Sequence, residues 1–367
     1  MLESVEWGEF KLGELFEVAT SKKRFDANKV TVLGNGSHPY IVRMGSNNGQ
    51  KGFIDEDLSF LNEGNTISFG QDTATMFYQE KPYFTGDKIK ILKPKESRFS
   101  KENVQFFIST MAKAFSTFSW GSSSFNVNII KNQLLTLPVS NEKKIDFDFM
   151  ERFIAELEAE RIAELEAYLS ATGLKDYHLT QEEQQVLDDF EAGKFVWCEF
   201  KFKEIFDQIK QGRRLKKDDQ LPGNIPFVMS GVTDTGVVNY ISNPIACFPK
   251  NSITVDIFGN AFYRGYCYGA GDDTGVYWSK SKNYSKEMML FFTSSINQAL
   301  MNKFDYGNKL RSSQSLNLKM NLLSKNNQPD LSIMETLISA VQKLVIKDVV
   351  EYADQKIAAH GQVANNA

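Results

Sequence analysis

"WGEFKLGELFE", residues 7–17, returns with modest changes as "WCEFKFKEIFD", residues 197–207. Six of the eleven positions are identical, and Leu15 is matched by the similar Ile205. The second stretch begins 190 residues after the first (197 − 7 = 190), so the match raises the question of whether a whole domain is repeated.

Other blocks of sequence recur in the same order and at nearly the same separation. The matched pairs are 38–54 with 225–241, 64–70 with 250–256, 83–88 with 268–273, 100–107 with 285–292 and 146–151 with 330–335. These offsets run from 184 to 187 residues (for example 334 − 150 = 184 and 225 − 38 = 187), so only short insertions and deletions separate the copies. A period this long is far above the roughly 20–50 residues of solenoid repeats. The sequence therefore predicts two tandem domains of one kind.

The composition is that of a globular protein without a membrane segment. The chain has 367 residues, 42% of them hydrophobic and 24% charged, which suits two domains of ordinary size. It contains no apolar run near the roughly 18 residues that a membrane span needs, and its first residues do not read as a signal peptide. The three cysteines (Cys198, Cys247, Cys267) form no C-x-x-C pair, so we expect a reducing, cytoplasmic setting. The net charge of −4 argues against a surface coated by nucleic acid but leaves room for local basic patches.

Each copy follows one internal plan, which ends in a long helix. Short β-like runs with Gly and Asn turns precede an amphipathic helix, and the closing helices are expected at 147–169 and 331–357. Their apolar stripes approach heptad spacing, which favours a coiled-coil pair over the alternative that each helix packs on its own domain. The stripes consist of Met150, Phe153, Leu157, Leu165 and Tyr168 in the first helix and Met334, Leu337, Val341, Leu344, Val345 and Tyr352 in the second.

These elements predict an α+β chain of two repeated domains and two long helices. The expected boundaries are 1–145 for the first domain, 146–194 for the central helix and connector, 195–329 for the second domain, and 330–367 for the last helix and tail. The acidic connector 170–195 has no counterpart after the second copy. It is expected to hold a short extra helix, 181–190, with Thr180 as its N-terminal cap.

Motifs for catalysis are absent from the sequence. It has no G-x-x-x-x-G-K-[ST] loop, no H-E-x-x-H pair and no glycine-rich dinucleotide fingerprint. "SNPIACF", 242–248, lacks the second Pro and the aromatic residue of an N-P-P-Y motif, and no nuclease-like set of carboxylates is visible. We therefore expect a binding protein with no catalytic residue, metal or cofactor of its own.

The repeated blocks resemble those of a known family. "WGEFKLGELFEVATSKKR", "GNTISFG", "WCEFKFKEIFDQIKQGRR" and "NSITVDIFGNAFY" are similar to the DNA-specificity subunit of type I restriction-modification systems and to the separate specificity subunit of some type IIB systems. The resemblance spans residues 5–358 and rests on layout more than on any single motif. The connector 170–195 departs from it and leaves the spacing of the domains open.

The resemblance implies a division of labour along the chain. Two target-recognition domains would be held apart by an antiparallel pair of helices that form a coiled coil. Each domain would read one half of a split double-stranded DNA target. Methyltransferase subunits that carry S-adenosylmethionine would dock on the helices and domain flanks, and a restriction or translocase subunit would join them.

Candidate DNA-binding residues lie in loops at matching places of the two copies. Basic loops suit phosphate contacts, which position a protein without specifying sequence, whereas amides, hydroxyls and Arg suit base edges in the major groove. The phosphate candidates are Lys22, Lys23, Arg24, Lys210, Arg213, Arg214, Lys216 and Lys217. The base-reading candidates are Arg43, Ser46, Asn47, Asn48, Gln71 and Thr73 in copy one, and Ser230, Thr233, Asp234, Asn260 and Arg264 in copy two.

Two other interpretations stay open at this stage. The polar loop residues would simply solvate turns, or the duplicated domains would bind proteins or glycans, which the acidic total charge favours slightly. The paired basic loops and the layout of the chain oppose the second interpretation, whereas the first stays open for any single residue.

Overall fold

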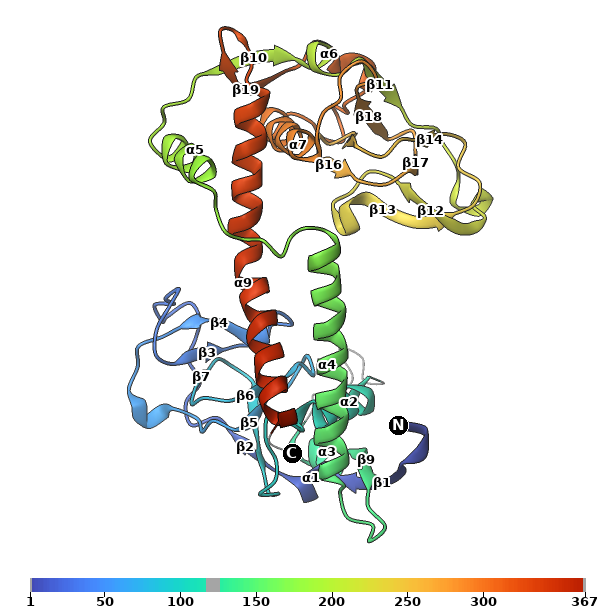
Figure 1. Ribbon diagram of the computed structural model, residues 1–367. Coiled ribbons are helices and arrows are strands. Elements are labelled where there is room, and N and C mark those ends of the chain that lie inside the picture. The colour runs from blue at the N-terminus through green and yellow to red at the C-terminus, as the bar shows by residue number, and fades with distance from the viewer. Residues whose placement is uncertain (1, 117–125, 366–367) are drawn as a thin grey trace. The chain divides into compact units, whose positions relative to one another are not determined.

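The computed structural model describes residues 2–116 and 126–365, with side chains described up to 359 (Figure 1). The fold is α+β, as the sequence predicts. The chain forms two compact units, a first that ends at Leu165 and a second that runs from Glu166 to Ala359.

The first unit contains three small sheets. Its four-stranded sheet has the antiparallel order β2 (Phe16–Thr20), β8 (Ile89–Pro94), β5 (Thr66–Gly70), β6 (Met76–Gln79). A three-stranded sheet has the order β4 (Gln50–Phe53), β3 (Pro39–Ile41), β7 (Phe84–Thr85), and β1 (Glu6–Lys11) pairs with β9 (Leu134–Val139). The helices are η1 (Leu2–Ser4), α1 (Leu12–Leu15), η2 (Asn47–Gly49), η3 (Leu58–Phe60), α2 (Val104–Phe115), α3 (Val127–Asn132) and α4 (Phe147–Ala171).

The second unit repeats these sheets in the same order. Its strands form β11 (Gln208–Gln211), β18 (Thr274–Trp278), β15 (Ser252–Asp256), β16 (Ala261–Arg264), then β13 (Val237–Ile241), β12 (Pro222–Val228), β17 (Tyr268–Ala270), β14 (Cys247–Phe248), and finally β10 (Trp197–Lys201), β19 (Lys319–Lys325), β20 (Gln328–Pro329). Its helices are α5 (Gln181–Glu191), α6 (Phe202–Ile205), η4 (Lys217–Asp219), η5 (Thr233–Gly236), α7 (Lys286–Leu300), α8 (Ser312–Ser315) and α9 (Leu331–Asn365). The sequence repeat is therefore a repeat of topology, down to one parallel pair in each copy, β3–β7 and β12–β17.

The opening motif recurs because the same packing recurs. In each copy its first half is an edge strand, whose Trp (Trp7 or Trp197) stays partly exposed. Its second half makes a single helical turn that buries apolar side chains, Leu15 in copy one and Ile205 in copy two. The following Phe enters the main core of its own domain, next to the amphipathic helix α2 or α7. Two Phe rings meet edge to face at this point in each copy, for example Phe206 and Phe292 at 5.7 Å.

The long helices begin on their own domains, and the residues of the predicted coiled-coil stripe differ in exposure. Met150 is buried in the first core, and Met334 and Leu337 are buried in the second. Val341 and Leu344 are 40% and 50% exposed. The least exposed residues of α9 are Met334, Leu337, Ala340, Val350 and Ala353.

Other stripe residues also differ in exposure. Phe153 is half-buried beside Phe106, at 5.4 Å between ring centroids, and Leu165 is half-buried. Leu157 and Tyr168 on α4 are exposed, as are Val345 and Tyr352 on α9. Helix α9 also extends beyond its predicted end at 357. Pairing of α4 with α9 as a coiled coil stays a prediction.

The connector forms the extra helix that the sequence predicts. Helix α5 begins with a capping box in which Thr180 and Glu183 bond to each other's backbone N–H. The Glu183 carboxylate is buried and accepts hydrogen bonds from Ser339 Oγ at 2.6 Å and Lys343 Nζ at 2.8 Å on α9. In copy one the aligned positions (offset 184) are Ala155 and Ala159, so the helix α4 lacks these anchors. Helix α5 therefore belongs to copy two alone.

Candidate nucleic-acid interface

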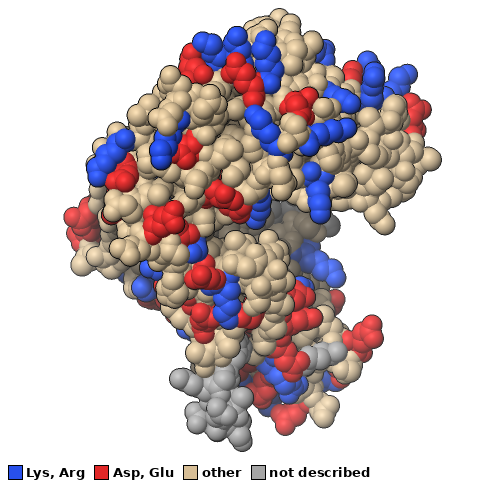
Figure 2. All heavy atoms as spheres, turned by 45° about the horizontal axis from the view of Figure 1, so that its top comes forward, with Lys and Arg blue, Asp and Glu red and all other residues tan. Residues whose placement is uncertain are grey.

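The charges of the chain are locally mixed. Figure 2 shows Lys and Arg side chains interspersed with Asp and Glu over the face in view, in keeping with the net charge of −4. Basic character is therefore a property of particular loops, and the two predicted basic loops are described next to their acidic neighbours below.

In copy one the basic loop follows β2 and exposes all three of its predicted residues, Lys22, Lys23 and Arg24. Lys23 Nζ lies 4.3 Å from the ring centroid of Phe60, a cation–π contact that leaves the ammonium near water. Arg24 donates to Asp87 at 3.1 Å, with more than half of each side chain exposed. Such an exposed pair contributes little to stability and can exchange for a phosphate.

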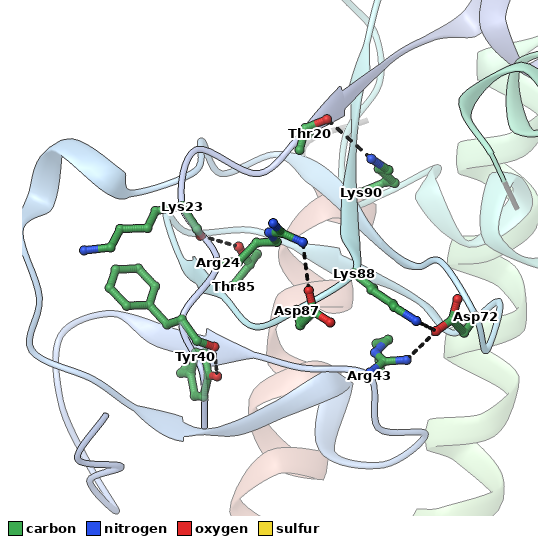
Figure 3. A network of polar contacts seen from close by, with 11 residues as sticks. Thr20, Lys23, Arg24, Tyr40, Arg43, Asp72, Thr85, Asp87, Lys88 and Lys90 are labelled. Carbon is green, nitrogen blue, oxygen red and sulfur yellow. Dashed lines mark hydrogen bonds and ion pairs between the residues drawn. The ribbon is translucent and has the colours of Figure 1, made fainter. Parts of the chain in front are cut away.

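A second set of charges in copy one ties two loops together. Arg43 NH1 and Lys88 Nζ each lie 2.7 Å from the same oxygen of Asp72, and Figure 3 shows both converging on it. Arg43 follows β3, whereas Asp72 lies in the turn between β5 and β6. The ion pair of Arg43 with Asp72 thus links the segment after β3 to the turn between β5 and β6, and these two segments hold the remaining base-reading candidates of copy one.

Three of the predicted residues in copy one surround a single hollow of about 800 Å³. Arg24, Arg43 and Thr73 line it, together with Asp87. Gln71 is half-buried in the same turn as Thr73, while Ser46, Asn47 and Asn48 stand exposed on a separate turn. Copy one therefore offers a hollow lined by two Arg and two Asp residues, with an exposed basic loop and an exposed polar turn beside it.

Copy two has a hollow of about 760 Å³ beside its basic loop. Three of the predicted phosphate candidates, Lys210, Arg213 and Arg214, line it, and Arg311 joins them. Lys216 and Lys217 are exposed but lie outside the residues that line the hollow. Arg311 was not predicted from the sequence, although its loop "NKLRSSQSLN" carries two basic residues that would have indicated it.

The polar loop between β12 and β13 is held from beneath by two carboxylates. Ser230 N–H donates to Asp273, and Gly231 N–H donates to the buried Asp256, each at 3.1 Å. Ser230 is half-buried, and Thr233 and Asp234 at the tip are exposed. The loop therefore presents two of its three candidates to solvent on a fixed base.

One candidate in copy two, Arg264, is buried, which corrects the prediction for that residue, and a second, Asn260, is half-buried. Arg264 is only 1% exposed, and its guanidinium donates to Thr254 Oγ1 at 3.0 Å and to Thr235 Oγ1 at 2.9 Å. Asn260 donates from its side-chain nitrogen to Asp256 at 2.9 Å and closes the turn after β15. Arg264 is out of reach of a base edge because it occupies an inward position of β16.

The domain flanks carry two apolar grooves that are related by the repeat. The groove of copy one has a volume of about 1080 Å³ and that of copy two about 770 Å³. Aligned residues line both: Trp7 with Trp197, Phe106 with Phe291, Ala114 with Ala299, Phe153 with Leu337, Ile154 with Ile338, and Leu157 with Val341. The exposed members of the predicted apolar stripes, Leu157 and Val341, thus each line a groove on their own domain.

Within the described parts of the chain, no group of three His, Cys, Asp or Glu residues is placed to hold a metal ion. The three cysteines are free thiols. None of the helices that the structure describes is long and apolar enough to cross a membrane.

A family model described as "Type I restriction modification DNA specificity domain" matches residues 4–167 and again 196–352. The matched residues make up most of the chain, so the chain belongs to this family. It is a DNA-specificity protein of the restriction-modification kind, and its two copies are two such domains.

Known proteins resemble the chain over nearly its whole length. The type II restriction enzyme BgcI specificity subunit S.BcgI from Heyndrickxia coagulans is 29% identical over 355 residues, which cover 95% of this chain and 98% of that one. The crystal structure of the type I restriction-modification system S subunit from M. genitalium superposes with a TM-score of 0.60 at 15% identity, covering 99% of this chain and 95% of that one. The second likeness supports the fold alone.

Proposed function

We propose that the chain is the sequence-reading subunit of a restriction-modification complex, in which each domain reads one half of a bipartite DNA target. The observation that carries this proposal is that each copy has an exposed basic loop, after β2 or β11, and an exposed polar turn, before β4 or β13, at matching places. The turn residues differ between the copies, Ser46-Asn47-Asn48 against Thr233-Asp234-Thr235, so the two half-sites are expected to differ in sequence. The target is therefore asymmetric.

In this proposal the basic loops bind phosphates and the exposed turns contact base edges. Arg24 and Lys23 in copy one, and Arg213 and Arg214 in copy two, are exposed and attached to loops, as phosphate contacts require. Arg311 adds a fifth cation to this set, at the copy-two hollow. These contacts fix the register of each domain on the duplex and leave discrimination to the turns.

The grooves on the domain flanks supply the docking surface for methyltransferase subunits, which carry the S-adenosylmethionine. Each groove combines a partly exposed Trp with an exposed aliphatic residue of the long helix, Leu157 or Val341. Exposed apolar grooves of this size are typical of protein interaction sites. Because the groove occurs once in each copy, the chain is expected to hold two methyltransferase subunits, and a restriction or translocase subunit joins the complex.

We further infer that this chain transfers no methyl group and cuts no DNA by itself, and that it works in the cytoplasm. The likeness to S.BcgI, a specificity subunit of a type II enzyme, supports a separate specificity chain of that kind. The type I arrangement is equally compatible with the family match.

Reconstitution from purified parts tests the proposal. This chain alone and the methyltransferase subunit of its own system alone are each expected to leave duplex DNA unmethylated. Their mixture is expected to methylate DNA at one defined motif. Methyl transfer by the isolated chain would contradict the inference on catalysis, and a motif that does not depend on this chain would refute the proposed role. Specific binding of a protein or glycan with no DNA binding would favour the interaction-module alternative.

A further inference from the structure

Both copies carry an unusual turn at the same place in the fold. In copy one it is Asn47–Asn48, with φ angles of 48° and 53°, just before β4. In copy two it is Asp234–Thr235, with φ angles of 47° and 51°, just before β13. All four of these turn residues are exposed. Two consecutive residues other than Gly in the left-handed region are uncommon. The described chain has a further such pair, Asn326–Asn327 between β19 and β20, but only these two turns occur at matching places of the copies, and this recurrence calls for a cause.

Thr235 is the most unusual of these four residues in its backbone conformation. It is β-branched, and a β-branched residue at positive φ is a true conformational outlier. Such strain persists only where the surroundings hold it, and it gathers at functional positions. The buried Arg264 holds it here, because its guanidinium donates to both the hydroxyl and the carbonyl oxygen of Thr235.

Copy one holds its turn in the same way with a different side chain. Gln79 is 5% exposed and donates to the carbonyl oxygen of Asn48 at 3.2 Å, while the same nitrogen lies 3.1 Å from Ser68 Oγ. The register of the strands shows that Gln79 and Arg264 are equivalent, since each pairs with the first residue of the central strand, Thr66 or Ser252.

The hydroxyl on the central strand is equivalent as well. Ser68 and Thr254 are each the third residue of their strands, β5 and β15. Each hydroxyl oxygen lies within hydrogen-bond distance of the buried donor. In both copies, therefore, a buried polar side chain from the neighbouring strand, Gln79 on β6 or Arg264 on β16, lies against this hydroxyl and donates to the carbonyl oxygen of the second left-handed residue.

We propose that Asn47–Asn48 and Asp234–Thr235 are the turns that read bases, and that Gln79 and Arg264 are positioning residues that hold them in reading geometry. This inference rests on the proposed function and assigns its specificity to particular residues. A buried donor that locks an exposed turn reduces the conformational freedom the turn would lose on binding.

The chemistry of the turns predicts which bases they read. The amide nitrogens of Asn47 and Asn48 each donate to one backbone carbonyl, of Gln50 and Tyr78. Each amide keeps its second N–H and its oxygen for a base, the pattern that matches adenine in the major groove. Asp234 instead offers only acceptors, which match the amino group of cytosine. The half-site of copy one is therefore expected to contain adenine and that of copy two cytosine.

The test uses the chain assembled with the methyltransferase subunit of its own system, and the duplex that this complex selects from a random library. Two further duplexes carry that sequence with one or the other half scrambled. Gln79→Leu, which keeps the volume and loses the donor, is expected to lower discrimination at one half by at least tenfold and leave the other half unchanged. Arg264→Met is expected to do the same at the opposite half. Thr66→Val is the matched control, because it removes a buried hydroxyl of the same strand that bonds to Glu63 and Tyr83 rather than to Gln79.

The outcomes separate this inference from the proposed function. If the wild-type complex selects no sequence, the proposed function itself fails. If it does and Gln79→Leu retains both discrimination ratios, or loses both equally, the positioning role is wrong. Where Gln79→Leu or Arg264→Met does not fold, Gln79→Asn and Arg264→Lys take their places, since each keeps a polar side chain that no longer spans the distance to the turn. The same half-specific loss is expected of them.

Discussion

Replacing Glu183 by Gln removes the charge that fastens α5 to α9. Burial raises the pKa of this carboxyl, but hydrogen bonds from Lys343, Ser339 and the Thr180 backbone outweigh it and lower the pKa from its ordinary 4.5 to about 2. At about 1.4 kcal/mol for each pH unit, the bound carboxylate contributes about 3 kcal/mol at neutral pH. That amount corresponds to roughly a 100-fold change in the opening equilibrium of α5.

The pH dependence follows from the direction of the shift. Because the folded-state pKa lies below the ordinary value, the stabilisation is fully present above pH 4.5 and is lost as the pH falls towards 2. The difference between wild type and Glu183→Gln is therefore expected to be largest at neutral pH and to vanish near pH 2.

Hydrogen exchange of the 181–191 segment measures this opening directly. Glu183→Gln is expected to lose roughly two orders of magnitude of protection in α5 at neutral pH. Glu182→Gln, at an exposed position of the same helical turn, serves as the control and should retain protection. Unchanged protection in Glu183→Gln, or an equal loss in both variants, would refute the account of α5 as a helix anchored through Glu183.

The remaining predictions concern the two kinds of surface. Substituting Arg213 and Arg214 by Ala should weaken binding to all duplexes about equally and lower the slope of log affinity against log salt by about 0.9 for each lost phosphate contact, as a salt titration would show. A loss confined to one sequence would mean that these side chains read bases. Leu157→Glu and Val341→Glu should each change the free energy of unfolding by no more than about 0.5 kcal/mol, because both positions are exposed, yet should abolish co-purification with the methyltransferase subunit. Intact co-purification would place the docking surface elsewhere.

Much of the fold could be predicted from the sequence because the domain occurs in two copies along the chain. The motif that runs from Trp7 to Phe16 and from Trp197 to Phe206 combines an edge strand with a buried helical turn. Its recurrence, with other blocks in the same order at a nearly constant offset, excludes a chance match. The extra helix could be predicted from one residue, since a Thr before an amphipathic stretch with Glu at the third position is a strong start signal.

The side of a strand or helix that faces the core was harder to predict. Arg264 was placed among the base readers because its residue type suits that role, while its inward position on β16 makes it a support. Aligning it with the buried Gln79 would have indicated this. The stripe on α9 illustrates a related difficulty: Val341 and Leu344 are exposed, whereas Ala340 and Ala353 are buried, and a pattern of large apolar residues overlooks small buried ones.

The central claim is that each domain reads its own half of a split target. Long-read mapping of methylated bases, in cells that carry this gene with its methyltransferase, tests it most directly when wild type is compared with an Asn47→Ala/Asn48→Ala variant. We predict a wild-type motif of two different halves around an unspecified spacer of constant length, and a variant motif in which one half is relaxed and the other is unchanged. A continuous or palindromic wild-type motif, or relaxation of both halves in the variant, would contradict the account.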